Sequence, residues 1–281
     1  MKKLQDSWFD FFRSGQLENN WWQRKKDLYY EREAEIVKIS GQGDIYEELR
    51  HSGQVMYRYL LHLSFLVKQH SHFFREEQVI PFQFRWENGE IMEHQSVTPP
   101  FEMENEISIE SESFRELSGE RFSYDRRAAV QYAERWWNSY NPAYRRFNVD
   151  CTNYVSQCMY AGGAPMRGAP DRASGWWYQN DNWSFSWAVA HSLRWYLSGS
   201  MSGLKGKEME LARDLIPGDI ICYDFEGDGN WNHNTIVVAK DANDMPLVNA
   251  HTDNSRNRYW SYEDSTAWTP DIQYKFFRIG E

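Results

Sequence analysis

Apolar residues in the second half of the chain recur at helical spacing in three segments. The first begins at Ser123 or Asp125 and ends at Pro142, because a helix interior does not tolerate proline. The second spans residues 150–162, and the third spans residues 186–197. This spacing gathers the apolar side chains of each segment on one helix face. We therefore expect three helices that share an apolar core.

After these segments the pattern changes to short apolar runs rich in β-branched residues. Four such runs, separated by turn residues, span residues 220–225, 235–240, 247–251 and 274–279. Runs of this length and spacing predict strands of an antiparallel sheet. Helices followed by such a sheet make an α+β domain.

The first part of the chain combines helix and sheet in a smaller module. Residues 17–38 have the pattern of a helix with a highly charged outer face. Aromatic and β-branched residues then dominate residues 55–67, 72–86 and 90–97, and Asn88-Gly89 is a strong hairpin signal. We expect a second α+β fold here, in which a curved antiparallel sheet covers one helix.

An acidic stretch separates the two parts. Residues 98–120 hold seven glutamates against one basic residue, Arg115. Like charges repel one another, so such a stretch stays extended and solvated. We therefore place an acidic linker here, between a module of unknown role over residues 1–97 and the main domain over residues 121–281.

Charge and composition narrow the choice of partners. The 281 residues include 31 Lys and Arg against 41 Asp and Glu, a formal net charge of −10. Without a basic block, such a chain is a poor candidate for binding nucleic acid or an anionic membrane surface. Gln5, Asp6 and Asp10 interrupt the opening sequence where a signal peptide needs an apolar run, and no segment reaches membrane-spanning length. We expect no membrane span and a cytoplasmic location.

The three cysteines are too few for a disulfide framework, and their spacing does not suggest zinc. Cys158 and Cys222 lie in apolar patterns and are expected to pack as small hydrophobic residues, the commoner role of a cysteine. Cys151 differs because it falls in the first turn of an expected helix, capped by Asn148 or Asp150. Unpaired backbone N–H groups and the positive end of the helix dipole favour a thiolate there.

Two histidines supply what a nucleophilic cysteine needs, a base within hydrogen-bond reach and a group that orients the base. His233 opens a β-branched run, and His251 lies near the end of the next run. Asn249 and His251 are two residues apart on one expected strand, so their side chains point to the same face. Either of them is a candidate to hold the ring of His233.

These motifs together resemble a known family. DCTNYVSQC, the tryptophan-rich segment after it, LIPGDIICYDFEGDGNWNH and VNAHT are similar to the putative amidase domain family of spore-forming bacteria, a branch of the papain-like cysteine peptidase and cell-wall amidase clan. The resemblance covers residues from Asp125 to the C-terminus. It implies a papain-like domain with helices packed on an antiparallel sheet or half-barrel. It also implies Cys151 as nucleophile and His233 as base, and it favours His251 over Asn249 as the third member.

Four further residues are expected around this site. Asp150 is interpreted as a helix cap, and Asn153, Gln157 and Trp231 as residues that orient the site or contact the substrate. On a helix, Asn153 and Gln157 have the alternative of being exposed or bonded to the next loop.

The loop before His233 is weighed as a metal site. Asp224, Glu226 and Asp228 are similar to the start of a calcium loop of the EF-hand kind. The twelfth position holds Thr235 where such a loop needs a bidentate glutamate. We therefore expect a polar turn, with a metal site as the weaker alternative, and no cofactor.

The expected function is that of a cysteine-dependent amidase or peptidase that hydrolyses an amide through a thioester on Cys151. The resemblance implies a peptide or peptidoglycan-derived amide as the substrate. One alternative is a catalytically lapsed binding or structural protein of the spore or cell envelope, with a spore-associated location. The other is an acyltransferase that uses the same nucleophile with an amine acceptor.

Overall fold

The protein is described by a computed structural model, which covers residues 2–14, 21–51, 54–97 and 122–280. The predicted acidic linker over residues 98–120 lies outside the described residues. The chain divides into two compact units. The first unit comprises Met1–Pro100 and Ser261–Trp268, and the second comprises Phe101–Trp260 and Thr269–Glu281.

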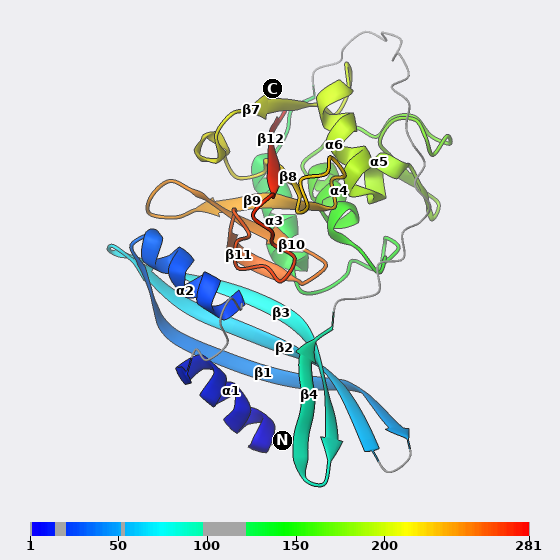
Figure 1. The fold of residues 1–281 in the computed structure, drawn as a ribbon. Helices are drawn as coiled ribbons and strands as arrows, with labels where there is room; N and C mark the ends of the chain where they lie inside the picture. Colours follow the sequence, from blue (N-terminus) through cyan, green and yellow to red (C-terminus); the bar gives the residue numbers. More distant parts are fainter. Residues whose placement is uncertain (1, 15–20, 52–53, 98–121, 281) are drawn as a thin grey trace. The chain divides into compact units, whose positions relative to one another are not determined.

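The first unit is an antiparallel meander with two helices (Figure 1). Its strands, which pair in sequence order, are β1 (Ala34–His51), β2 (Gln54–Gln69), β3 (His72–Glu87) and β4 (Glu90–Ser96). Its helices are α1 (Lys2–Ser14) and α2 (Trp21–Glu31). Alternate residues of β2 from Tyr59 to Val67 are buried in one core with Leu4 of α1 and Trp22 of α2. The α+β character and the antiparallel sheet are as predicted.

The helix expected over residues 17–38 is shorter in the structure. Helix α2 ends at Glu31, and Glu33 adopts a positive φ of 55° that reverses the chain before β1 begins at Ala34. The sequence prediction missed this turn because Glu33 is not a residue type that favours the left-handed region.

A buried ionic cluster lies inside the first unit. The ammonium group of Lys25 on α2 binds the carboxylate of Glu76 on β3 and, at 2.8 Å, that of Asp264. The Tyr29 hydroxyl donates to Glu76 as well. All four side chains are buried, so each charge depends on its partners in place of water. The segment Ser261–Trp268 is thereby fixed to α2 and β3.

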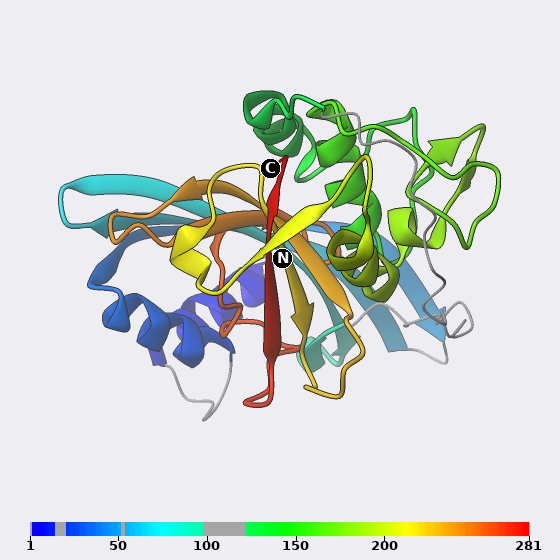
Figure 2. The same cartoon turned by 90° about the horizontal axis from the view of Figure 1, so that it is seen from above.

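The second unit contains helices in the three predicted regions and an antiparallel sheet. The first helix ends at Trp136, before the predicted Pro142, and the third is divided at Val189 into two helices. The helices of this unit are α3 (Arg126–Trp136), α4 (Cys151–Ala161), α5 (Phe185–Ala188), α6 (Ala190–Gly199) and the 3-10 turn η1 (Ala212–Asp214). Its sheet has the order β11 (Ser255–Tyr259), β10 (Pro246–Ala250), β9 (His233–Lys240), β8 (Ile220–Asp224), β12 (Gln273–Ile279) and β7 (Gly206–Met209). The pairs along this order are antiparallel (Figure 2). The small hairpin β5 (Tyr178–Gln179) and β6 (Asn182–Trp183) stands apart from it.

Helices α3, α4 and α6 pack on one face of this sheet. Alternate strand residues, such as Cys222 of β8 and Ile236 of β9, share a core with Ala133 of α3, Met159 of α4 and Leu193 of α6. The residues between them point to the opposite face. This alternation decides which strand side chains approach the start of α4.

Across the described ranges, no helix combines the length and the apolar character needed to cross a membrane.

Candidate functional site

The site is built around the first turn of α4. Cys151 is the first residue of this helix and is 1% exposed. The backbone carbonyl of Asp150 accepts the hydrogen bond of the Tyr154 N–H at 2.9 Å, which closes the first helical turn. The sequence therefore located the beginning of this helix correctly, with the thiol at its first position.

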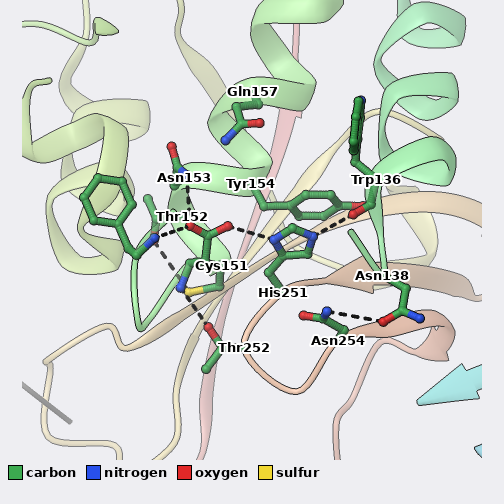
Figure 3. A network of polar contacts seen from close by, with 12 residues as sticks. Trp136, Asn138, Cys151, Thr152, Asn153, Tyr154, Gln157, His251, Thr252 and Asn254 are labelled. Atoms are coloured by element: carbon green, nitrogen blue, oxygen red, sulfur yellow. Dashed lines mark hydrogen bonds and ion pairs between the residues drawn. The ribbon is translucent and has the colours of Figure 1, made fainter. Parts of the chain in front are cut away.

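The Asp150 side chain does not have the predicted capping role. It makes no hydrogen bond to a backbone N–H of the first helical turn. Oδ1 instead accepts from the Phe147 N–H at 3.0 Å and from the Asn153 side-chain amide at 2.9 Å. Oδ2 turns to His251 (Figure 3). Asp150, predicted as a helix cap, instead links three segments of the chain through its carboxylate.

His251 follows the end of β10 and is held at both ring nitrogens (Figure 3). Nδ1 lies 2.7 Å from Asp150 Oδ2, and Nε2 lies 2.8 Å from the carbonyl oxygen of Trp136, the last residue of α3. A carbonyl oxygen only accepts, so Nε2 is the donor in the second bond. The ring also stacks on Tyr154, with centroids 4.1 Å apart.

The two alternatives for the third member of the triad thus have partners other than the base. His251 joins the end of α3 to the start of α4, in place of the expected role of orienting His233. The Asn249 amide donates to Glu134 at 2.9 Å, and its carbonyl oxygen accepts from the Asn257 N–H. The spacing of Asn249 and His251 predicted that their side chains point to the same face of a strand, but it could not show which partner each would meet.

His233 is the first residue of β9 and pairs with Tyr223 of β8. Its ring lies beside the rings of Tyr223 and Phe225, with centroid distances of 5.5 and 6.0 Å. Burial, and secondarily the charge of Arg258, lowers the pKa of His233 to about 3. The imidazole is therefore neutral near pH 7, the form that can accept a proton.

The next residue, Asn234, faces the start of α4. Its side-chain amide donates to the Thr152 hydroxyl oxygen at 2.9 Å, and that oxygen lies 3.7 Å from the sulfur of Cys151. The Asn234 backbone also hydrogen-bonds to the Cys151 thiol. The structure therefore brings Cys151 to the beginning of β9. Because neighbouring strand residues point to opposite faces, the ring of His233 leaves the strand on the side away from Thr152.

The pKa of the Cys151 thiol is raised by burial, while hydrogen bonds from Asn234 and Thr152 oppose this rise. The sequence predicted a lowered pKa for this thiol from the backbone N–H groups and the dipole at the helix start. Loss of hydration outweighs the dipole here, and the histidine is neutral. Burial also raises the pKa values of Cys158 and Cys222, as expected for packed cysteines.

The remaining predicted residues of the site are all buried. Asn153 donates to the carbonyl oxygen of Arg145 and accepts from the indole of Trp187 at 2.8 Å. Gln157 accepts from the Tyr132 hydroxyl at 2.6 Å. Trp231 packs in the core of the second unit, with Arg194 over its ring. Asn153 and Gln157 thus connect α4 to other segments and are not solvent-exposed.

The chain was compared with known proteins. The family model of the Putative amidase domain matches residues 123–277, more than half of the chain.

The chain belongs to this family.

The chain is also similar to two proteins from Bacillus subtilis (strain 168). The uncharacterized protein YhbB is 47% identical over 264 residues, which cover 92% of this chain and 85% of the relative. The uncharacterized protein YjcM is 26% identical over 162 residues, or 54% of this chain and 35% of the relative. No solved structure matches the chain. Membership of the Putative amidase domain family indicates amide hydrolysis as the reaction class.

The loop weighed as a metal site is closed by its own backbone. The Asp224 carboxylate accepts from the N–H groups of Gly227, Asp228 and Gly229, and Glu226 accepts from the side-chain amide of Asn232. No group of three His, Cys, Asp or Glu residues with metal-holding geometry occurs within the described ranges. The loop forms a polar turn that leads into β9.

The sequence analysis missed Thr152 and Asn234 as members of the site in this amidase-family domain. Thr152 carries a weak signal, because polar residues are common at helix starts. Asn234 also carries a weak signal, since it lies just before the β-branched run that begins at Thr235 and follows other polar residues. A buried amide needs a partner, and here that partner is the hydroxyl beside the thiol.

Proposed function

We propose that the protein is a cysteine-dependent amide hydrolase in which Cys151 is the nucleophile and His233 the base. The observation that supports this most directly is that the Cys151 sulfur lies 3.7 Å from the Thr152 hydroxyl oxygen, which accepts from Asn234, the residue next to His233 at the start of β9. Membership of the Putative amidase domain family supports the reaction class. Because the ring of His233 lies beside Tyr223 and Phe225, on the side of β9 away from Thr152, the proposal requires this ring to turn at the first residue of the strand to reach the thiol.

The proposed reaction starts from a neutral thiol and a neutral imidazole. The sulfur of Cys151 attacks the amide carbonyl carbon while the thiol proton passes to His233. The tetrahedral oxyanion collapses, the C–N bond breaks, and the imidazolium gives its proton to the leaving amine. Water, deprotonated by His233, then attacks the thioester carbon, and the sulfur leaves with a proton from the imidazolium. The products are a carboxylic acid, an amine and the original thiol.

The resting protonation states agree with this order of steps. Burial keeps the Cys151 thiol protonated and His233 unprotonated near pH 7, so proton transfer accompanies attack in place of a preformed ion pair. The first turn of α4 supplies backbone N–H groups, which are suited to hold the oxyanion without reorganisation.

As finer parts of the same proposal, the domain has a papain-like architecture and acts on a peptide or a peptidoglycan-derived amide. The order of helix with cysteine, then strand with histidine, then strand with polar residues supports the first part. The acidic charge of the chain argues only against polyanionic partners and leaves peptides as substrates.

The test is hydrolysis of a panel of peptidoglycan fragments and dipeptide amides by the full chain, followed by mass spectrometry. Wild type should release a new carboxylic acid, and the acid-quenched enzyme should carry the acyl group on Cys151. Cys151→Ala should abolish both, and His233→Gln should lower kcat by about 100-fold or more. Cys158→Ala, a cysteine on the same helix with a packing role, should retain activity. Turnover that survives Cys151→Ala, or a kcat indifferent to His233→Gln, would contradict the proposal.

A second candidate is a binding protein that keeps the fold without turnover. The observation in its favour is the burial of Cys151 at 1% exposure, together with the raised pKa of its thiol. Saturable binding of one fragment from the same panel, without product and equally strong in Cys151→Ala, would establish this function and exclude the first.

A further inference from the structure

Asn234 has an unusual position beside the proposed nucleophile. It is fully buried on β9, and its side-chain amide donates to the hydroxyl oxygen of Thr152 on α4. That hydroxyl oxygen lies 3.7 Å from the Cys151 sulfur, within the range of a hydrogen bond to sulfur. The three groups thus form a chain from the strand to the thiol.

The direction of these hydrogen bonds matters for the thiol. A hydroxyl has one hydrogen to donate and two lone pairs that accept. Because the Asn234 amide fills one acceptor position of Thr152, it holds the oxygen in place and leaves the hydroxyl hydrogen free to turn toward sulfur. A hydroxyl so placed stabilises a thiolate more than a thiol, since a charged acceptor forms the stronger hydrogen bond.

The side-chain carbonyl oxygen of Asn234 argues against the idea that this residue serves mainly to stabilise the fold. Its carbonyl oxygen is buried and has no hydrogen-bond partner. A buried polar atom without a partner is destabilising, and an apolar side chain of the same shape would avoid the loss. The residue therefore contributes something other than fold stability.

We infer that Asn234 is a positioning residue for Cys151, acting through the Thr152 hydroxyl to stabilise the thiolate. The inference deepens the proposed function and rests on it, since it assigns Asn234 and Thr152 to the same nucleophile. Neither residue exchanges a proton with the substrate in this scheme. Their effect is on the acidity of the thiol and, through it, on the rate of attack.

The test measures the thiol pKa of Cys151 directly, from the ultraviolet absorbance of its thiolate against pH, with the matching Cys151→Ser protein as the blank. Asn234→Leu should raise this pKa by about one unit, which makes the thiolate about tenfold scarcer at a given pH below the pKa. It should leave the stability to urea unchanged or increased. A purely structural residue would show the reverse, with lost stability and an unchanged thiol pKa.

A double-mutant cycle identifies the route of the effect. Thr152→Val should raise the thiol pKa at least as much as Asn234→Leu, and adding Asn234→Leu to it should cause no further change. Thr152→Ser, which keeps the hydroxyl, should restore the wild-type value. The matched control is Thr235→Val, which removes a buried hydroxyl from the same strand, one that bonds Tyr223 on the other face.

Three results would overturn the inference. A thiol pKa that is unchanged in Asn234→Leu removes the positioning role. A pKa that falls shows that the hydroxyl had donated to Asn234 and not to sulfur. Fully additive effects of the two substitutions remove the route through Thr152.

If Asn234→Leu does not fold, Asn234→Asp replaces it, because a carboxylate cannot donate and should also raise the pKa. No substrate is needed, so failure to find hydrolysis would count against the proposed function alone.

Discussion

Burial controls the protonation of the two side chains proposed to react. Cys151 and His233 are 1% and 8% exposed, and each is shifted toward its neutral form. For the imidazole the shift is large, because the charge of Arg258 acts in the same direction as desolvation. A buried neutral histidine should leave a mark on the stability of the protein in acid.

We expect the free energy of unfolding to decrease as the pH is lowered, partly because of His233. Its pKa is about 3 in the folded state against 6.5 for an unperturbed imidazole. Its contribution is complete above the unfolded value and is lost as pH falls toward the folded one, since only the unfolded chain binds the proton in that window. The slope from this one group approaches ~1.4 kcal/mol per pH unit.

Urea unfolding of wild type and His233→Gln over a series of pH values measures this contribution. The stability of the variant should depend less on pH between about 6 and 4, because glutamine does not titrate. Parallel curves for the two proteins would show that His233 is accessible to protons in the folded state.

The positions of Cys151 and His233 in the chain could be predicted, but their environments could not. Helical spacing placed the cysteine at a helix start, and the β-branched run placed the histidine at a strand start. Period-two alternation fixes which strand residues share a face, but not which face meets the cysteine helix. The balance between helix dipole and desolvation depends on burial, which is a property of the packed chain. The roles of Thr152 and Asn234 were missed for the same reason.

At the scale of elements, one polar junction ties together α3, α4 and the end of β10. His251 contributes the ring, Trp136 the last carbonyl oxygen of α3, and Asp150 the carboxylate before α4. All three bonds of the Asp150 carboxylate are made within the second unit. The junction fixes the point at which the nucleophile helix begins.

Replacing His251 by alanine should lower the free energy of unfolding far more than replacing a surface histidine does. His251→Ala leaves the Asp150 carboxylate buried without its partner, so we expect a loss of about 3 kcal/mol in the free energy of unfolding. His70→Ala, which alters an exposed ring in the first unit, should stay within about 0.5 kcal/mol of wild type.

Urea unfolding of the single variants and of the Asp150→Asn, His251→Ala double variant tests the junction as a pair. The double variant should be more stable than the sum of the two single losses implies, since the unpaired charge is then absent. Simple additivity would mean that the two side chains do not act together.

The elements themselves were largely foreseeable, and β11 and α1 are among the exceptions. Strands β8, β9, β10 and β12 and helices α3, α4 and α6 lie where apolar periodicity placed them. Strand β11, SRNRY, has a polar sequence with no apolar run and was not predicted. Helix α1 was missed because its opening sequence was weighed only as a targeting segment. For β11, pairing with β10 in the folded chain, and not a local pattern, decides the structure.

At the scale of the whole molecule, the first unit is discontinuous in sequence. It takes the segment Ser261–Trp268 from within the span that the sequence analysis assigned to the main domain. The Asp264 side chain helps to fix this segment, through the buried ammonium group of Lys25. The boundary at residues 98–120 remains a prediction, but a simple division of the chain at that point would remove Asp264 from the unit it stabilises.

Asp264→Ala should therefore loosen the first unit although it lies near the C-terminus. The ammonium group of Lys25 would be left buried with Glu76 as its remaining carboxylate partner, so the amide groups of α2 and β3 should exchange hydrogen faster. Hydrogen exchange read by mass spectrometry locates the effect. Protection of α4 and β9 should stay as in wild type.

Glu263→Ala is the matched control for this experiment. Its backbone carbonyl, and not its carboxylate, accepts from Arg24, so the variant should leave exchange in α2 unchanged. Faster exchange that is confined to α4 and β9 in Asp264→Ala would place residue 264 with the other unit.

The late position of Asp264 also has a consequence for the newly made chain on the ribosome. Lys25 and Glu76 emerge early, but their third partner is synthesised only after nearly the whole second unit. At ordinary rates of translation this gap lasts on the order of ten seconds or more. During that time the nascent first unit lacks the Asp264 carboxylate that completes its buried cluster, and chaperones can bind the incomplete unit. Emergence of Asp264, and not of residue 100, is the earliest moment at which the first unit can complete this buried cluster.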